Sequence, residues 1–142
     1  MNSNAELWAC DTSVAVPALD PNHQAHGVCR QAVIEYRPAL SGHAVFESYA
    51  VLTRLPLSLR LLPEQADDVL ARAYPETCWL DESETIELRA RLADLNVIGG
   101  ATYDALVGAA ALANGRRLLT RDRRAESTYR SLGVDYVWVD RP

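Results

Sequence analysis

The chain has 142 residues and a formal net charge of −5, and 49% of its residues are hydrophobic. A chain of this length buries roughly two-thirds of the surface that its unfolded state exposes, so we expect one folded domain rather than two domains or a disordered chain. All fourteen basic residues are arginine, which excludes mechanisms that need a lysine, such as a Schiff base or a phosphate-binding loop ending in Gly-Lys.

The sequence shows no sign of export or membrane insertion. Its N-terminal residues lack a basic segment followed by a long apolar stretch, and no apolar run approaches membrane-spanning length. Cys10, Cys29 and Cys78 are widely spaced and form no metal-ligand pattern, so we interpret them as buried thiols in a reducing compartment. We therefore expect a cytoplasmic protein.

The first half of the chain predicts strands and helices in alternation. Leu7–Cys10 is a short apolar run that ends at Asp11, as expected of a buried strand. Apolar residues then recur at three- and four-residue intervals, which predicts an amphipathic helix over residues 25–36. A short strand and turn are expected at 40–42, followed by a helix over 45–56 that contains Glu47.

The second half continues this alternation. We expect helices over 63–73, 83–95, 105–113 and 125–132, and strands over 78–80, 118–120 and 134–139. Ser83 and Thr102 are the expected N-caps of two of these helices. Strands alternating with helices favour a parallel sheet covered on both faces, which binds ligands at the carboxyl ends of its strands.

Several acidic residues are placed to meet at that edge. Asp11 and Asp122 each follow a predicted strand, Asp104 lies in the first turn of a helix, and Glu47 can join them from its own helix. Clustered carboxylates raise one another's pKa unless a cation neutralises them. Hard oxygen ligands suit Mg²⁺ or Mn²⁺, which activate water for phosphodiester hydrolysis, so the cluster predicts a divalent-metal site.

Each aspartate also has a purely structural explanation. Asp11 fits a helix cap, Asp104 complements a helix dipole, and Asp122 fits a turn. Glu47 is harder to explain in this way, because apolar residues follow it at helical spacing and a lone carboxylate on an apolar face would be unfavourable. Position alone leaves the two interpretations of each acid open.

Taken together, four segments resemble the PIN domain. They are Asp11-Thr12-Ser13-Val14, Phe46-Glu47-Ser48, Tyr103-Asp104-Ala105-Leu106-Val107 and Leu118-Leu119-Thr120-Arg121-Asp122. They occur in the family's order and span nearly the whole chain. The sequence is similar in particular to compact bacterial PIN ribonucleases of the VapC type, which are toxins of toxin-antitoxin pairs.

The resemblance implies a single PIN domain over residues 1–142, with a three-layer α/β/α fold and a central parallel sheet of four to five strands. It further implies Mg²⁺- or Mn²⁺-dependent endoribonuclease activity. The expected partners are an RNA substrate, a second copy in a homodimer, and a small cognate antitoxin that covers the acidic pocket.

The same resemblance implies roles for individual residues. Asp11 and Asp104 match the principal metal ligands, Asp122 matches a further ligand, and Glu47 completes the catalytic acids. Two hydroxyls, those of Ser13 and Thr120, match groups that orient carboxylates or waters. We leave Glu126 out of the site because its position one helical turn later directs it to solvent.

Charge is unevenly distributed along the chain. Six of the fourteen arginines lie between residues 116 and 130, and Arg121 and Arg123 are the expected contacts to the RNA backbone. Arg130 better fits an ion pair within its helix. The segment from Glu64 to Asp94 carries nine carboxylates against three arginines, which fits either a solvated helix pair or a docking surface for a basic antitoxin.

The tryptophans carry no separate functional signal. Trp8, Trp79 and Trp138 lie in strand-like segments, and we expect them in the core rather than at a surface that stacks with bases.

The acidic residues are compatible with functions besides RNA cleavage. A metal-dependent phosphatase with Asp11 as nucleophile is one of them, opposed by a serine at position 13 and by the absence of lysine. A DNA nuclease would use the same metal chemistry on a different substrate. A PIN-like domain that binds without catalysis would be favoured if one of the four acids were missing, and none is missing.

Overall fold

The computed structural model describes residues 5–140, and its centre is a five-stranded sheet in the order β3-β2-β1-β4-β5. Every neighbouring pair of strands is parallel. The strands are β1 (Leu7–Cys10), β2 (Ala39–Ser41), β3 (Thr77–Cys78), β4 (Arg116–Thr120) and β5 (Tyr136–Trp138). The expected parallel sheet of four to five strands is confirmed.

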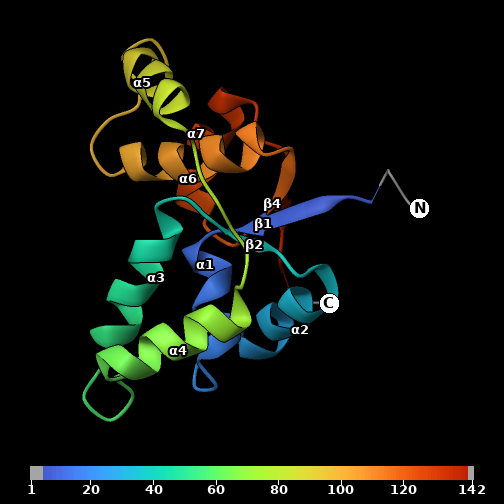
Figure 1. Ribbon diagram of the computed structural model, residues 1–142, viewed down its shortest axis with the longest axis vertical. Coiled ribbons are helices and arrows are strands. Elements are labelled where there is room, and N and C mark those ends of the chain that lie inside the picture. The colour runs from blue at the N-terminus through green and yellow to red at the C-terminus, as the bar shows by residue number, and fades with distance from the viewer. Residues whose placement is uncertain (1–4, 141–142) are drawn as a thin grey trace.

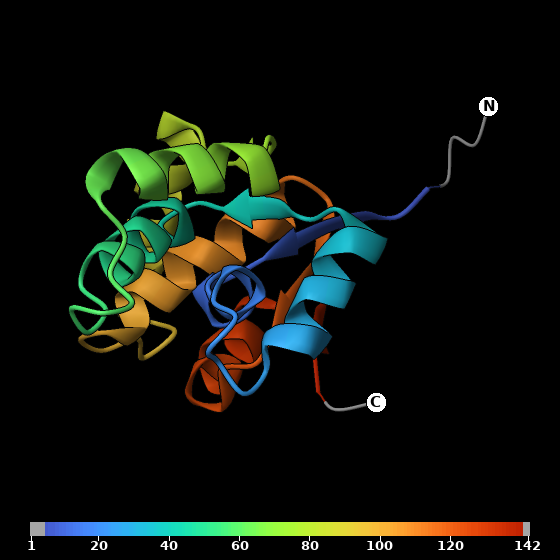
Figure 2. The ribbon, with the colours of Figure 1, turned by 90° about the horizontal axis from the view of Figure 1, so that it is seen from below.

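Helices cover both faces of this sheet. They are α1 (Thr12–Ala15), α2 (His26–Tyr36), α3 (Ala44–Thr53), α4 (Pro63–Ala73), α5 (Glu82–Arg91), α6 (Ala101–Ala113) and α7 (Glu126–Leu132), with short 3₁₀ turns at Pro17–Leu19 and Arg123–Ala125. Figure 1 shows α5, α6 and α7 on one side of the strands and α1 to α4 on the other. Figure 2 looks from the side of α1 and α2, which lie in front of the strands. The three-layer α/β/α fold is therefore confirmed.

The core forms where the central strands meet the helices. Cys10 pairs with Leu40 of β2 and with Leu119 of β4, and all three side chains are buried. Central strands of a parallel sheet are covered on both faces, which explains their short, continuous apolar runs. The small residues of α6, including Ala105 and Ala111, are buried and allow this helix to approach the sheet closely.

The order of the strands places a crevice beside β1. The chain runs outward from β1 to β2 and β3 on one side, and β4 and β5 are added on the other side. Parallel α/β sheets bind ligands at the point where this direction reverses, at the carboxyl ends of the strands. Asp11, directly after β1, and Asp122, two residues after β4, lie on the two sides of this point.

The structure corrects several local expectations. Asp81, rather than Ser83, caps α5, and its carboxylate accepts a hydrogen bond from the Glu84 backbone N–H at 2.7 Å. Thr102 lies inside α6, whose N-cap position is Gly100. Both helices begin earlier than expected because periodicity defines a helix face better than its first residue.

The expectation of three core tryptophans was also wrong in part. Trp8 is buried, but the side chain of Trp79 is 45% exposed because it follows the two-residue edge strand β3. The three cysteines are buried and unpaired among the described residues, as expected. Within residues 5–140, no helix combines the length and apolar character needed to cross a bilayer.

Candidate active site

All four predicted acids line one cleft at the carboxyl edge of the sheet. The cleft has a volume of about 320 Å³ and a largely polar lining. Its lining residues are Asp11, Thr12, Ser13, Glu47, Asp104, Val107, Arg121, Asp122, Arg124 and Tyr129. The acids come from four separate elements: the end of β1, α3, α6 and the turn after β4. The fold thus brings together carboxylates that are far apart in the sequence.

Asp11 is the most enclosed of these acids, with only 5% of its surface exposed. Its Oδ1 accepts hydrogen bonds from the backbone N–H and the hydroxyl of Ser13, at 3.0 and 2.5 Å. Its Oδ2 accepts from the hydroxyls of Thr120 and Tyr129, at 2.5 and 2.8 Å. Burial raises the pKa of the Asp11 carboxyl above its ordinary value, and the hydrogen bonds from the hydroxyls of Ser13, Thr120 and Tyr129 offset only part of this rise.

Two backbone groups orient the hydroxyls around Asp11. The Arg121 N–H donates to Ser13 Oγ at 2.7 Å, and the Asp122 N–H donates to Thr120 Oγ1 at 3.1 Å. A hydroxyl that already accepts from a backbone N–H directs its single hydrogen toward another acceptor, which here is Asp11. The segment after β4 is therefore tied to the end of β1 through Ser13 and Thr120, the two hydroxyls expected to orient the site.

Asp104 carries the clearest electrostatic signal in the cleft. It lies half-buried in the first turn of α6. Burial, followed by repulsion from Asp122, Asp11 and Glu47, raises the pKa of its carboxyl to about 6. Arg124 lowers the pKa of Asp104, but by less than burial and the neighbouring acids together raise it.

Glu47 and Asp122 occupy more open positions. Glu47 is exposed in the first turn of α3, so the expectation that it lies on an apolar face was wrong. Because Glu47 remains exposed to water, its carboxylate lines the cleft without a large desolvation penalty. Asp122 caps the 3₁₀ turn after β4, and its Oδ1 accepts from the Arg124 N–H at 3.0 Å. Asp122 is therefore both the N-cap of this turn and one of the four acids that line the cleft.

The arginines divide between the cleft and the opposite side of the turn. Arg121 and Arg124 line the cleft. The Arg124 side chain is 96% exposed, and its Nε lies 3.8 Å from Asp122 Oδ1. Arg123, expected to contact RNA, instead pairs with Asp140 at 2.7 Å and lies over the ring of Trp138. The structure thus places Arg124, which sequence reasoning missed, where Arg123 was expected.

Glu126 and Arg130 lie outside the cleft lining, as expected, but the expectation that Glu126 is directed to solvent was wrong. Glu126 accepts a hydrogen bond from the Tyr136 hydroxyl at 3.0 Å and pairs with Arg130 at 3.6 Å. Its two carboxylate oxygens are therefore engaged by Tyr136 of β5 and by Arg130 of α7. The ion pair expected within that helix for Arg130 is confirmed.

Tyr129 is the main site residue that sequence reasoning missed. It lies on α7, is 1% exposed and reaches Asp11 across 118 positions of the sequence. Its helical spacing predicts only a core residue, and no local pattern reveals which polar group a buried phenol meets. A buried tyrosine hydroxyl usually has a hydrogen-bond partner. A tyrosine predicted to lie in the core is therefore expected to contact some polar group, although the sequence does not identify that group.

The donor chemistry of the cleft fits Mg²⁺ or Mn²⁺. All four acids supply carboxylate oxygens, and among residues 5–140 no three His, Cys, Asp or Glu side chains form a ready-made metal cage. Mg²⁺ does not need such a cage, because it binds through one or two carboxylates and keeps several waters. The repulsion among these acids, which contributes to the raised pKa of Asp104, is what a bound cation would relieve.

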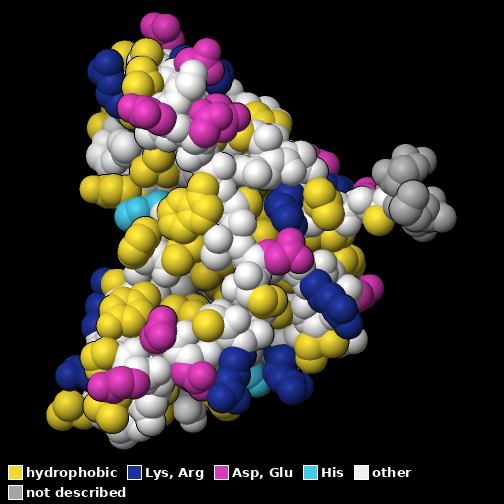
Figure 3. Space-filling view, in the orientation of Figure 1, with side chains coloured by type: hydrophobic (Ala, Val, Ile, Leu, Met, Phe, Trp, Pro, Cys, Tyr) yellow, Lys and Arg dark blue, Asp and Glu magenta, His cyan; other side chains and the backbone are white. Residues whose placement is uncertain are grey.

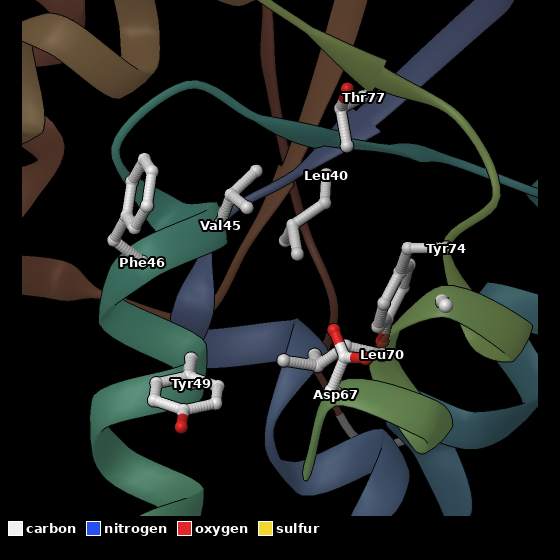
Figure 4. A pocket seen from close by; sticks show the side chains of 9 residues that line it. Leu40, Val45, Phe46, Tyr49, Asp67, Leu70, Tyr74 and Thr77 are labelled. Carbon is white, nitrogen blue, oxygen red and sulfur yellow. The ribbon is translucent and has the colours of Figure 1, made fainter. Parts of the chain in front are cut away.

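A second hollow on the surface has a different character. It has a volume of about 390 Å³ and lies between α3 and α4, where Figure 4 shows Val45, Phe46, Tyr49 and Leu70 around it. Asp67 is the one carboxylate in its lining. A lining with a single carboxylate and no basic side chain offers too few metal ligands and no cationic contact for phosphate, so the chemistry belongs to the smaller acidic cleft.

Comparisons with known proteins agree with this geometry. The PIN domain family model matches residues 9–131. Ribonuclease VapC27 of Mycobacterium tuberculosis is 43% identical over 129 residues, which cover 91% of this chain and 94% of that protein. Ribonuclease VapC40 of the same species is 42% identical over 134 residues, covering 94% of this chain and 99% of that protein. The chain belongs to the PIN-domain family.

Proposed function

We propose that this protein is a divalent-metal-dependent endoribonuclease and that residues 1–142 act as a single PIN domain. The observation that carries this proposal is the convergence of Asp11, Glu47, Asp104 and Asp122 on one polar cleft. A bound Mg²⁺ or Mn²⁺ would activate water and neutralise charge that develops on the scissile phosphate. The names of the two relatives, both ribonucleases, support RNA as the substrate.

The protein's own residues would perform three tasks. Asp104, Asp122 and Asp11 would hold the cation, one or two of them directly and the rest through its coordinated waters. Glu47, as the most exposed of the four acids, would orient water at the mouth of the cleft. Ser13 and Thr120 would keep Asp11 in one orientation through the hydrogen bonds described above. Arg124, whose side chain is 96% exposed, would hold the RNA backbone beside the acids, because guanidinium groups bind phosphate in a bidentate manner. The Nε–H of Arg121 donates to Val139 O at 3.0 Å, so Arg121 would contact the backbone through its two terminal nitrogens.

The residues around Asp11 oppose a phosphatase mechanism. A phosphatase with Asp11 as nucleophile would be expected to carry a second carboxylate two positions later and a lysine to balance the charge of the phosphate. This chain has Ser13 at that position and contains no lysine. Hydrolysis by activated water needs no side-chain nucleophile and is therefore the better-supported chemistry.

The function is tested by incubating purified protein with mixed cellular RNA in Mg²⁺ or Mn²⁺ and mapping new RNA ends. We expect discrete cuts that disappear in EDTA and in Asp104→Asn. Single-stranded DNA of matched sequence in the same reaction distinguishes a ribonuclease from a DNA nuclease. Intact RNA in every metal, with folded protein, would favour a non-catalytic binding domain.

We further propose that a small basic antitoxin restrains this activity, so that the protein is the toxin of a toxin-antitoxin pair. Acidic side chains gather over α5 and along α4, as Figure 3 shows, and complement a basic partner. Charge reversal at Glu82 and Glu84 of α5 should weaken co-purification with the co-expressed antitoxin while RNA cleavage by the free protein persists.

A homodimer is also part of the proposal. Phe46 and Tyr103 directly precede Glu47 and Asp104, and their side chains are 65% and 52% exposed. Exposed apolar side chains gathered on one surface are typical of an interface. Sedimentation should show a dimer that Phe46→Glu dissociates.

We place the protein in the cytoplasm, because its buried free thiols suit a reducing compartment.

A further inference from the structure

The environment of Tyr129 distinguishes it from an ordinary core residue. Its ring is buried under α6, yet its hydroxyl reaches the acidic cleft and donates to Asp11 Oδ2 at 2.8 Å. Thr120 donates to the same oxygen at 2.5 Å. The phenol thus adds a second hydrogen bond to this oxygen and limits rotation of the Asp11 carboxylate.

The phenol ring of Tyr129 packs directly against the backbone of Gly108 in α6, in the space that a side chain there would fill. A Cβ added at Gly108 would lie 2.9 Å from Tyr129 Cδ1 and 3.0 Å from Val134 Cγ2. Distances this short are too close for carbon atoms, whose favourable separation is roughly 3.5–4.0 Å. The close approach of α6 to α7 therefore requires glycine at this position, and it determines where the Tyr129 hydroxyl lies.

We propose that Tyr129 is a positioning residue of the metal site, held against Gly108, and that it strengthens cation binding by fixing the orientation of Asp11. This inference rests on the proposed function, because it assumes that the cation binds in the acidic cleft. Hydrogen-bond partners of metal-binding groups typically change metal affinity by about 10- to 100-fold. Because Ser13 and Thr120 still hold Asp11 after the phenol is removed, we expect an effect near the lower end of this range.

The structure offers a matched control for removal of the phenol. Tyr74 is also buried, and its hydroxyl donates to the backbone oxygen of Ala15 at 2.9 Å. It lines the apolar hollow between α3 and α4 rather than the acidic cleft. Tyr74→Phe and Tyr129→Phe therefore each remove one buried phenol hydrogen bond, and the two variants differ in whether Asp11 is the acceptor.

The test is the affinity of the RNA-free protein for Mn²⁺, measured by the loss of the electron paramagnetic resonance signal of the free ion. We expect binding about tenfold weaker in Tyr129→Phe and within about twofold of wild type in Tyr74→Phe. Gly108→Ala should also weaken binding, since it displaces the ring but keeps the hydroxyl, and it carries the test if Tyr129→Phe does not fold. Asp104→Asn removes one carboxylate of the cleft, so it should weaken Mn²⁺ binding if the ion occupies the cleft.

The possible failures are distinguishable. Equal Mn²⁺ affinity in wild type, Tyr129→Phe and Gly108→Ala, with weaker binding in Asp104→Asn, would overturn the role of Tyr129 and leave the metal site intact. Equal loss in Tyr74→Phe and Tyr129→Phe would show a general effect of stability and would also overturn it. An unchanged affinity in Asp104→Asn would place the ion elsewhere and overturn both the proposed metal site and this inference.

Discussion

Thr120 and Asp11 are joined by a buried hydrogen bond of 2.5 Å across 109 positions of the sequence. The same hydroxyl accepts the backbone N–H of Asp122 at 3.1 Å, so one side chain connects two acids of the cleft. The bond also bridges β1 and β4, whose carboxyl ends meet at the point where the strand order reverses. Folding of the sheet and assembly of the site are thus coupled through Thr120.

Thr120→Val tests this coupling, because it keeps the shape of the side chain and removes the hydroxyl. It leaves the Asp122 N–H without its acceptor, so we expect a loss of about 1–3 kcal/mol in the free energy of unfolding. RNA cleavage should fall as well. Ser41→Ala is the control, since this buried hydroxyl donates to Val107 O at 2.8 Å and lies outside the lining of the cleft. Chemical denaturation and cleavage rates should separate the variants: Ser41→Ala loses stability and retains cleavage.

Asp104→Asn should separate activity from stability. We expect cleavage in Mg²⁺ to fall by about 100-fold or more, which corresponds to a loss of roughly 3 kcal/mol of transition-state stabilisation. In EDTA the variant should unfold at a higher temperature than wild type, because it removes repulsion with Asp122, Asp11 and Glu47. A lower unfolding temperature in EDTA would contradict the presence of unrelieved repulsion in the cleft.

The pH dependence follows from the raised pKa of Asp104, about 6 in the folded protein against an ordinary value of 3.8. Between these values the folded state binds more protons than the unfolded state. This contribution to stability is therefore complete below the unfolded pKa and is lost as the pH rises through about 6. On the proposed function, Mg²⁺ would bind the ionised carboxylates, so it should stabilise the protein mainly above that pH. Thermal unfolding with Mg²⁺ or EDTA, on both sides of the transition, measures the effect, and Asp104→Asn should remove it.

Arg124→Ala and Arg123→Ala should affect different properties. Arg124 lines the cleft with a highly exposed side chain, so its removal should weaken RNA binding and lower the magnitude of the salt slope by about one. Arg123 is engaged by Asp140 and Trp138, so its removal should mainly reduce stability, by about 0.5–1 kcal/mol. Fluorescence anisotropy of labelled RNA in EDTA, at several salt concentrations, measures binding without cleavage. If Arg123→Ala instead weakened RNA binding and Arg124→Ala mainly reduced stability, the RNA would lie along the side of the turn that carries Trp138.

The amino-acid sequence by itself determined the α/β class and the placement of Asp11, Asp104 and Asp122 at one edge of the sheet, whereas Glu47 joined them on the resemblance to the PIN domain. Short apolar runs that end at Asp11 and near Asp122 indicate parallel strands, and the carboxyl ends of parallel strands share one edge of a sheet. The position of Asp104 in the first turn of α6 could also be predicted, because the Ala-rich pattern after Asp104 defines that helix. These properties depend on local periodicity, which the linear sequence contains in full.

Only the tertiary structure decided which side chains surround each acid. The Tyr129 hydroxyl meets Asp11 because α6 and α7 approach closely at Gly108, and no pattern local to α7 records that contact. Arg124 rather than Arg123 faces the cleft because the 3₁₀ turn after β4 sets the direction of each side chain. Such directions depend on contacts between elements distant in the sequence, so they are determined only when the layers pack together.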